Sequence, residues 1–182
     1  METQEPIKTE KKIVDKSMLT GVFTDRESAE KAYHTLHERG YTNKEINLIM
    51  SDETRKKYFA DTIIANDFGH QVGAGAGSVI GGTVGAIVAI VVAVGTSLFI
   101  PGIGLIIAGP LAAGLAGAGA GAVTGGILGA LVGAGMTDEH AKLYESAVEN
   151  GDIIVGVYPR NEDEAELIEA DWRAHNAVNI HR

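Results

Sequence analysis

Two charged flanks enclose one long uncharged tract, and this division is the strongest pattern along the 182-residue chain. Residues 72–136 contain no Asp, Glu, Lys, Arg or His, yet they hold 19 of the 24 glycines. Both flanks alternate apolar and polar positions as ordinary globular sequence does. We therefore divide the chain into a disordered, solvated tail (1–16), a first half (17–71), the tract (72–136) and a second half (137–182).

The first half predicts a β-α-β unit followed by a connecting helix. Residues 18–23 ("MLTGVF") and 45–51 ("EINLIMS") are short apolar runs typical of strands. The helix between them has one apolar face, formed by Ala29, Ala32, Tyr33 and Leu36. Thr24 with Glu27 predicts a capping box at the start of this helix.

The second half repeats the same pattern. Residues 152–158 ("DIIVGVY") and 177–181 ("AVNIH") predict two more strands. The helix between them has an apolar face formed by Ala165, Ile168 and Trp172. A further helix precedes this unit, with Thr137 as its N-cap. Two β-α-β units in one chain predict an α+β fold, a ferredoxin-like split β-α-β domain that carries the tract as an insertion between its halves.

Small residues recur at every fourth position of the tract. The glycines in this spacing are Gly73, Gly77, Gly81, Gly85, Gly109, Gly117, Gly121, Gly125, Gly129 and Gly133. Residues four apart form one ridge of a helix, and a ridge of small residues lets a second helix backbone approach closely. Pro101 and Gly102 mark a turn in the middle. The tract therefore predicts a long helical hairpin, packed through a glycine zipper.

An all-apolar hairpin must be surrounded by lipid or by protein, and the sequence leaves both open. One expectation is insertion in the cytoplasmic membrane as transmembrane helices, because each arm exceeds the roughly 20 residues that cross a bilayer. Arg55, Lys56 and Lys57 precede the hairpin, so both termini would be cytoplasmic. The alternative is a soluble, cytoplasmic homo-oligomer whose hairpins pack into a shared core. The expected partners are other copies of the chain, with the lipid bilayer as a further partner in the first case.

Composition and charge exclude several function classes. A formal net charge of −9 without a basic stripe argues against nucleic-acid binding, and the absence of cysteine excludes thiolate chemistry. His34 and His37 have a metal-compatible spacing, but a solvated helix face explains them better. His70 and His140 bracket the tract, and ordinary surface positions explain them better than a pH-dependent role. We find no catalytic residues, metal site, cofactor motif or identifiable small-molecule substrate, and expect no enzyme.

Three stretches carry a family resemblance: "MLTGVFTDRESAEKAYHTLHERGYTNKEINLIM" (18–50), "HAKLYESAVENGDIIVGVY" (140–158) and "EDEAELIEADWRAHNA" (162–177). With the glycine-rich stretch between them, they resemble the bacterial general-stress, heat-induced YflT-like domain family. The resemblance implies a bacterial, stress-associated protein without an assigned enzymatic activity. Many relatives have a shorter central stretch, so the resemblance assigns no function to the tract. We therefore expect a non-enzymatic stress or envelope protein anchored in the membrane by a self-associating hairpin, with the soluble assembly protein as the alternative.

Overall fold

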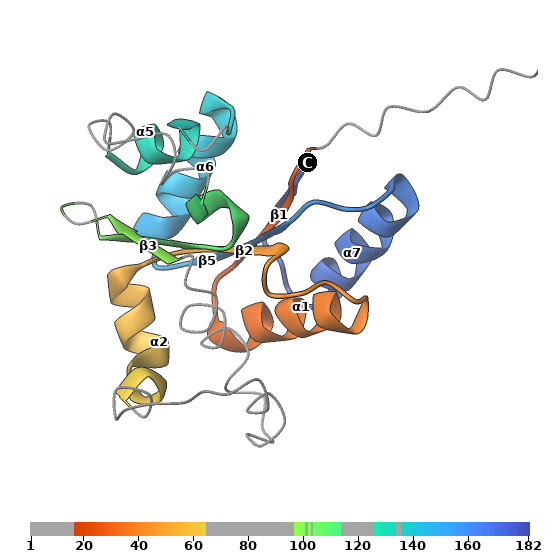
Figure 1. The fold of residues 1–182 in the computed structure, drawn as a ribbon, viewed down its shortest axis with the longest axis horizontal. Coiled ribbons are helices and arrows are strands. Elements are labelled where there is room, and N and C mark those ends of the chain that lie inside the picture. The colour runs from red at the N-terminus through yellow and green to blue at the C-terminus, as the bar shows by residue number, and fades with distance from the viewer. Residues whose placement is uncertain (1–16, 65–96, 101, 103, 114–125, 134–135) are drawn as a thin grey trace, which may run out of the picture.

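The computed structural model describes residues 17–64, 97–100, 102, 104–113, 126–133 and 136–182 (Figure 1). The strands are β1 (Leu19–Phe23), β2 (Ile46–Ser51), β3 (Ser97–Ile100), β4 (Leu105–Ala108), β5 (Ile153–Val157) and β6 (Asn179–His181). The helices are α1 (Arg26–Glu38), α2 (Asp52–Ile64), α5 (Gly126–Gly133), α6 (Asp138–Glu149) and α7 (Glu162–Ala174). Together they form a mixed α+β fold around one six-stranded antiparallel sheet of order β3-β4-β2-β5-β1-β6.

The two flanks of the sequence share this sheet. Strand β5 of the second half lies between β1 and β2 of the first half, with Gly21 opposite Val155 and Leu48 also opposite Val155. Strand β6 then pairs with the free side of β1. The strands predicted in both flanks and the α+β class are confirmed, and strands of the two flanks pair with each other in the sheet.

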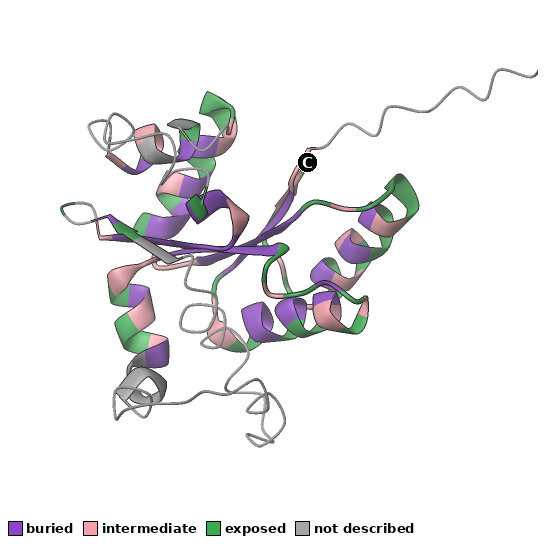
Figure 2. Ribbon diagram, in the orientation of Figure 1, coloured by how far each residue is buried: buried purple, intermediate pink, exposed green. Residues whose placement is uncertain are grey.

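One face of the sheet is covered by α1, α7 and α2 (Figure 1). The apolar faces predicted for α1 and α7 are buried on it, as the purple stripes of Figure 2 show. Trp172 of α7 is fully buried and meets Phe23 edge to face, with ring centroids 6.0 Å apart and an interplanar angle of 86°. Such a pair contributes about 0.5–1.5 kcal/mol beyond its buried area. Gly21 leaves room for this ring, because a Cβ there would lie 2.7 Å from Cε3 of Trp172.

The opposite face is covered by α6, α5 and the helical residues 110–113. Ala141, Tyr144 and Val148 of α6 are buried against the sheet. Ile127 and Leu131 of α5 belong to the same cluster, so part of the uncharged tract contributes to this core. The expected tract boundaries at residues 72 and 136 stay a prediction, but described residues between them pack with the flanks.

The helix caps follow the predictions with one difference. The carboxylate of Asp25 accepts hydrogen bonds from the backbone N–H and the hydroxyl of Ser28, each at 2.8 Å, and caps α1. The predicted capping box with Thr24 as N-cap is wrong, because the side chain of Asp25 takes that position. Helix α6 begins as predicted, since Oγ1 of Thr137 accepts a hydrogen bond from the backbone N–H of His140.

The middle of the tract differs from the expected helical hairpin. Residues 97–100 and 105–108 form strands β3 and β4, which pair with each other, and β4 continues the sheet beside β2. The carbonyl of Gly104 accepts a hydrogen bond of 2.7 Å from the backbone N–H of Asp52 and ties the turn to the start of α2. These four-residue apolar runs gain their backbone hydrogen bonds from the sheet and not from a helix.

The expected membrane location is also wrong. In the described ranges, no helix combines the length and the apolar character that a bilayer-crossing helix needs. This finding contradicts the expected transmembrane helices and the cytoplasmic-membrane location with both termini on the cytoplasmic side.

Candidate functional site

The predicted helix-packing glycines fall into three groups. Seven lie outside the described residues: Gly73, Gly77, Gly81, Gly85, Gly117, Gly121 and Gly125. Gly129 and Gly133 lie in α5, where the backbone N–H of Leu128 donates a hydrogen bond of 3.2 Å to Oε1 of Glu145 in α6. Gly109 lies in a turn after β4 and not on a helix. The zipper itself stays a prediction.

Gly109 instead joins the tract to the sheet. Its φ angle is +95°, and a Cβ there would lie 2.2 Å from the carbonyl oxygen of Ile46 in β2. Next to it, Oδ1 of the buried Asn47 accepts a hydrogen bond of 2.8 Å from the backbone N–H of Leu111. The backbone of Gly109 thus packs closely against β2, and the hydrogen bond between Leu111 and Asn47 holds the helical residues after it.

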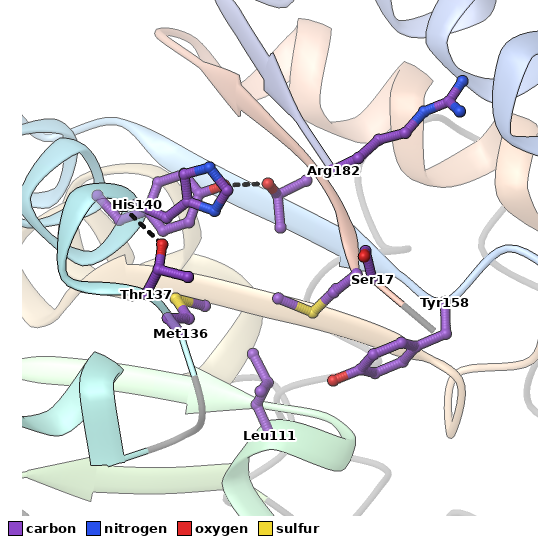
Figure 3. A pocket seen from close by; sticks show the side chains of 10 residues that line it. Ser17, Leu111, Met136, Thr137, His140, Tyr158 and Arg182 are labelled. Atoms are coloured by element: carbon purple, nitrogen blue, oxygen red, sulfur yellow. Dashed lines mark hydrogen bonds between the residues drawn. The ribbon is translucent and has the colours of Figure 1, made fainter. Parts of the chain in front are cut away.

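Leu111 forms one wall of a pocket on the α6 face of the sheet (Figure 3). The pocket has a volume of about 210 Å³. It is lined by Ser17, Met18, Thr20, Leu111, Met136, Thr137, His140, Tyr144, Tyr158 and Arg182. Gly156 of β5 helps to keep it open, because a Cβ there would lie 3.2 Å from Sδ of Met18 and 3.3 Å from Cγ2 of Thr20.

Two hydroxyl groups meet at the polar end of the pocket. Thr20 of β1 and Tyr144 of α6 are both buried, and their hydroxyls hydrogen-bond to each other. Oγ1 of Thr20 also donates to the carbonyl oxygen of His181, at 3.3 Å, so the Tyr144 hydroxyl is the donor in the first bond. Burial raises the pKa of Tyr144. The phenol therefore stays protonated and keeps an oxygen lone pair as an acceptor.

Two histidines lie beside this hydroxyl pair. The ring of His140 in α6 lies 5.1 Å from the ring of His181 in β6 and 6.3 Å from the ring of Tyr144, measured between centroids. Burial lowers the pKa of His181, and the charge of His140 lowers it further, while Glu139 raises it. Nε2 of His181 is buried and has no hydrogen-bond partner in the described structure. His140 is thus half-buried in an aromatic cluster, not the ordinary surface residue that we expected.

Arg182 lines the pocket but directs its charge elsewhere. Its guanidinium forms ion pairs with Glu162 and Glu169 of α7. Figure 3 shows the side chain pointing away from the other lining residues. The rest of the lining combines hydroxyl groups and the imidazole of His140 with thioether, aliphatic and aromatic groups.

The first helix offers a different environment for its histidines. Nε2 of His34 lies 3.4 Å from Oε1 of Glu38, and both side chains are exposed. Nε2 of His37 hydrogen-bonds to the hydroxyl of Tyr33. Among the residues that the structure describes, no three potential metal-ligating side chains lie close enough together to hold an ion.

Sequence reasoning missed most of the pocket because its residues are scattered along the chain. Thr20 and Tyr144 are 124 positions apart, and only the β1–β5 pairing and the packing of α6 bring them together. The one local signal was Asn47, a polar residue in the otherwise apolar run "INLIM", since a buried amide must find a partner. The chain matches no known protein family, no curated protein and no solved structure.

Proposed function

We propose that the chain is a non-enzymatic assembly protein that self-associates through its uncharged tract, beginning at the edge strand β3. The observation that carries this proposal is the state of that strand. Phe99 of β3 is 52% exposed, and no described strand pairs with the outer side of β3. Unpaired backbone groups beside an exposed aromatic ring form a ready template for another strand.

The two edges of the sheet differ in a way that supports this choice. Strand β3 ("SLFI") carries no charged residue and no proline. Strand β6 at the opposite edge has three residues, and His181 and Arg182 place polar and charged groups along it. Charged, very short edges discourage pairing, whereas uncharged apolar edges invite it. The partner for β3 is a second copy of the same strand, because antiparallel pairing about a two-fold axis continues the sheet and closes the contact.

The remaining tract then forms the shared apolar core that the sequence predicts for an oligomer. Part of the 65-residue uncharged tract is buried in its own molecule, and a neighbouring copy would supply an apolar environment for the rest. Assembly of this kind requires no catalytic group, in keeping with a structural role.

The fold and the biological context are part of the same proposal. The central order β2-β5-β1-β6, with α1 and α7 packed on one face, supports a ferredoxin-like split β-α-β core. The resemblance of the flanks to the general-stress YflT-like family supports a role in a bacterial stress response. Strands β4 and β3 are then additions to the β2 edge of that core.

The experiment measures the mass of the full chain in solution by light scattering across a dilution series. Phe99→Lys places a charge on the proposed interface, and two copies paired about the axis then repel each other. We expect the wild type to form dimers or larger assemblies, and Phe99→Lys to raise the dissociation constant roughly tenfold, which corresponds to about 1.4 kcal/mol.

Leu167→Lys is the matched control, because Leu167 of α7 is 53% exposed and lies far along the chain from the edge. It should assemble as the wild type does. A monomeric wild type at all concentrations, or equal masses for the Phe99 and Leu167 variants, would refute the proposal. Circular dichroism of both variants verifies that the fold is retained.

A further inference from the structure

We propose that the pocket between β1, α6 and residues 110–113 binds a small neutral phenol, a single aromatic ring with one hydroxyl group. The proposal does not depend on the pairing of β3, because none of the pocket residues lies in that strand, although Leu111 and Met136 belong to the tract. It rests on the size of the pocket, on the chemistry of its two ends and on the commitment of its one permanent charge elsewhere.

The volume is sufficient for a ligand with one ring. The pocket has a volume of about 210 Å³ and is partly open to solvent. An apolar cavity of about 150 Å³ already accommodates benzene, so this pocket has room for one ring with a substituent. Gly156 maintains the space, since any side chain at that position would point toward Met18 and Thr20.

The apolar part of the lining suits an aromatic ring. Met18 and Met136 bring two thioether groups to the pocket, and Leu111 adds a branched aliphatic wall. Figure 3 shows Leu111 and Tyr158 across the pocket from Met136 and His140. Thioether sulfur makes favourable contacts with aromatic rings, and methionine adapts its shape to a bound ligand.

The polar end suits a hydroxyl group. The Tyr144 hydroxyl gives its hydrogen to Thr20 and retains an acceptor lone pair. The imidazole of His140 also lines the pocket, and one of its ring nitrogens can donate. A phenol hydroxyl is both donor and acceptor, so it satisfies Tyr144 and His140 together.

A carboxylate fits this end poorly. It has no hydrogen to donate to the Tyr144 oxygen, and burying a charge requires a paired cation. The candidate cation, Arg182, is held by Glu162 and Glu169 and turned away from the pocket. The neutral hydroxyl is therefore the head group that the pocket favours over an acid of the same size.

The test titrates the full chain with phenol, toluene and benzoate and measures heat release. We expect saturable binding of phenol and weaker binding of both other probes. Tyr144→Phe removes the acceptor, so it should weaken phenol binding by roughly three- to tenfold, the effect of one hydrogen bond, and leave toluene binding unchanged.

Met136→Trp tests the pocket without changing the buried hydroxyl pair, because Met136 is only partly buried and a larger side chain there occupies the pocket. It should abolish binding of phenol, whereas Leu143→Trp should leave binding intact, since Leu143 is 41% exposed on α6 and does not line the pocket. Three results would each overturn the proposal: phenol binding no tighter than toluene, benzoate binding tighter than phenol, or Met136→Trp binding phenol like the wild type.

Discussion

Replacement of Gly109 by alanine should destabilise the protein by blocking the attachment of the tract to β2. The added Cβ would lie 2.2 Å from the Ile46 carbonyl oxygen and 3.0 Å from Cα of Asn47, and both are backbone atoms of a central region of the sheet. Neither can rotate away as a flexible side chain does. The turn must therefore move, and Leu111 must move with it.

The expected magnitude has two parts. A non-glycine residue at φ of +95° costs about 1–2 kcal/mol in backbone strain. Displacement of the turn breaks the 2.8 Å bond between Leu111 and Asn47. A buried amide left without its partner costs about 1–3 kcal/mol more. The sum is a loss of roughly 2–5 kcal/mol in the free energy of unfolding.

Gly102 provides a matched control within the same tract. Its φ is +93°, yet a Cβ at Gly102 would meet no atom within 4 Å. Gly102→Ala therefore carries the backbone strain alone, about 1–2 kcal/mol. Urea unfolding followed by the fluorescence of Trp172, the single tryptophan, measures both variants. Equal losses of stability would refute the reasoning, because they would show that the contact with β2 contributes nothing.

Two further predictions concern His181 and Gly21. Burial and the charge of His140 lower the pKa of His181 in the folded protein below its usual 6.5. As pH falls below 6.5, the unfolded chain therefore binds the proton before the folded protein does. The free energy of unfolding decreases over this range. His181→Gln should flatten the dependence of the urea midpoint on pH across that range, and an unchanged slope would contradict the assignment. Gly21→Ala should cost about 1–3 kcal/mol by overpacking against Trp172 and should shift the tryptophan emission, and a wild-type midpoint and emission would argue against that contact.

The flanks were predictable because their signals are local. The helix faces of α1 and α7 repeat with the helical period, and Ala29, Leu36 and Trp172 are buried as that period requires. Short apolar runs bounded by turn residues marked β1, β2 and β5 correctly. The error at the cap of α1 was also local, since Thr24 and Asp25 are both good N-caps and adjacent in sequence.

The tract was not predictable by the same means, because an uninterrupted apolar run has no period to distinguish strand from helix. A signal was nevertheless present at its centre. "SLFI" and "LIIA" are four-residue runs, separated by the four residues "PGIG", and this length and spacing are typical of a β-hairpin. The regular spacing of glycines around them favoured a helix, although Gly109, one member of that spacing, adopts a φ that no helix interior contains.

The pairing of β4 with β2 explains why the tract and the flanks belong to one structure. Strand β2 is buried on both faces, with Leu48, Ile49 and Met50 each no more than 1% exposed. If such a strand were at the edge of the sheet, its outer backbone N–H and C=O groups would be unpaired beside apolar side chains and could pair with other chains. Strand β4 covers it from Leu48 to Ser51, so the hairpin satisfies the backbone of β2 inside the same molecule.

The hairpin moves the edge of the sheet from β2 to β3, so one edge strand is still unpaired among the described strands. Strand β3 becomes the last described strand on that side, and it exchanges the long apolar edge of β2 for a four-residue edge without charge. Selection against association favours a charged residue or a proline in such a strand. The opposite edge has this kind of protection, because His181 and Arg182 lie on or next to β6. The exposed Phe99 on this uncharged edge is the feature that supports our proposal of a second copy of the chain as the partner of β3.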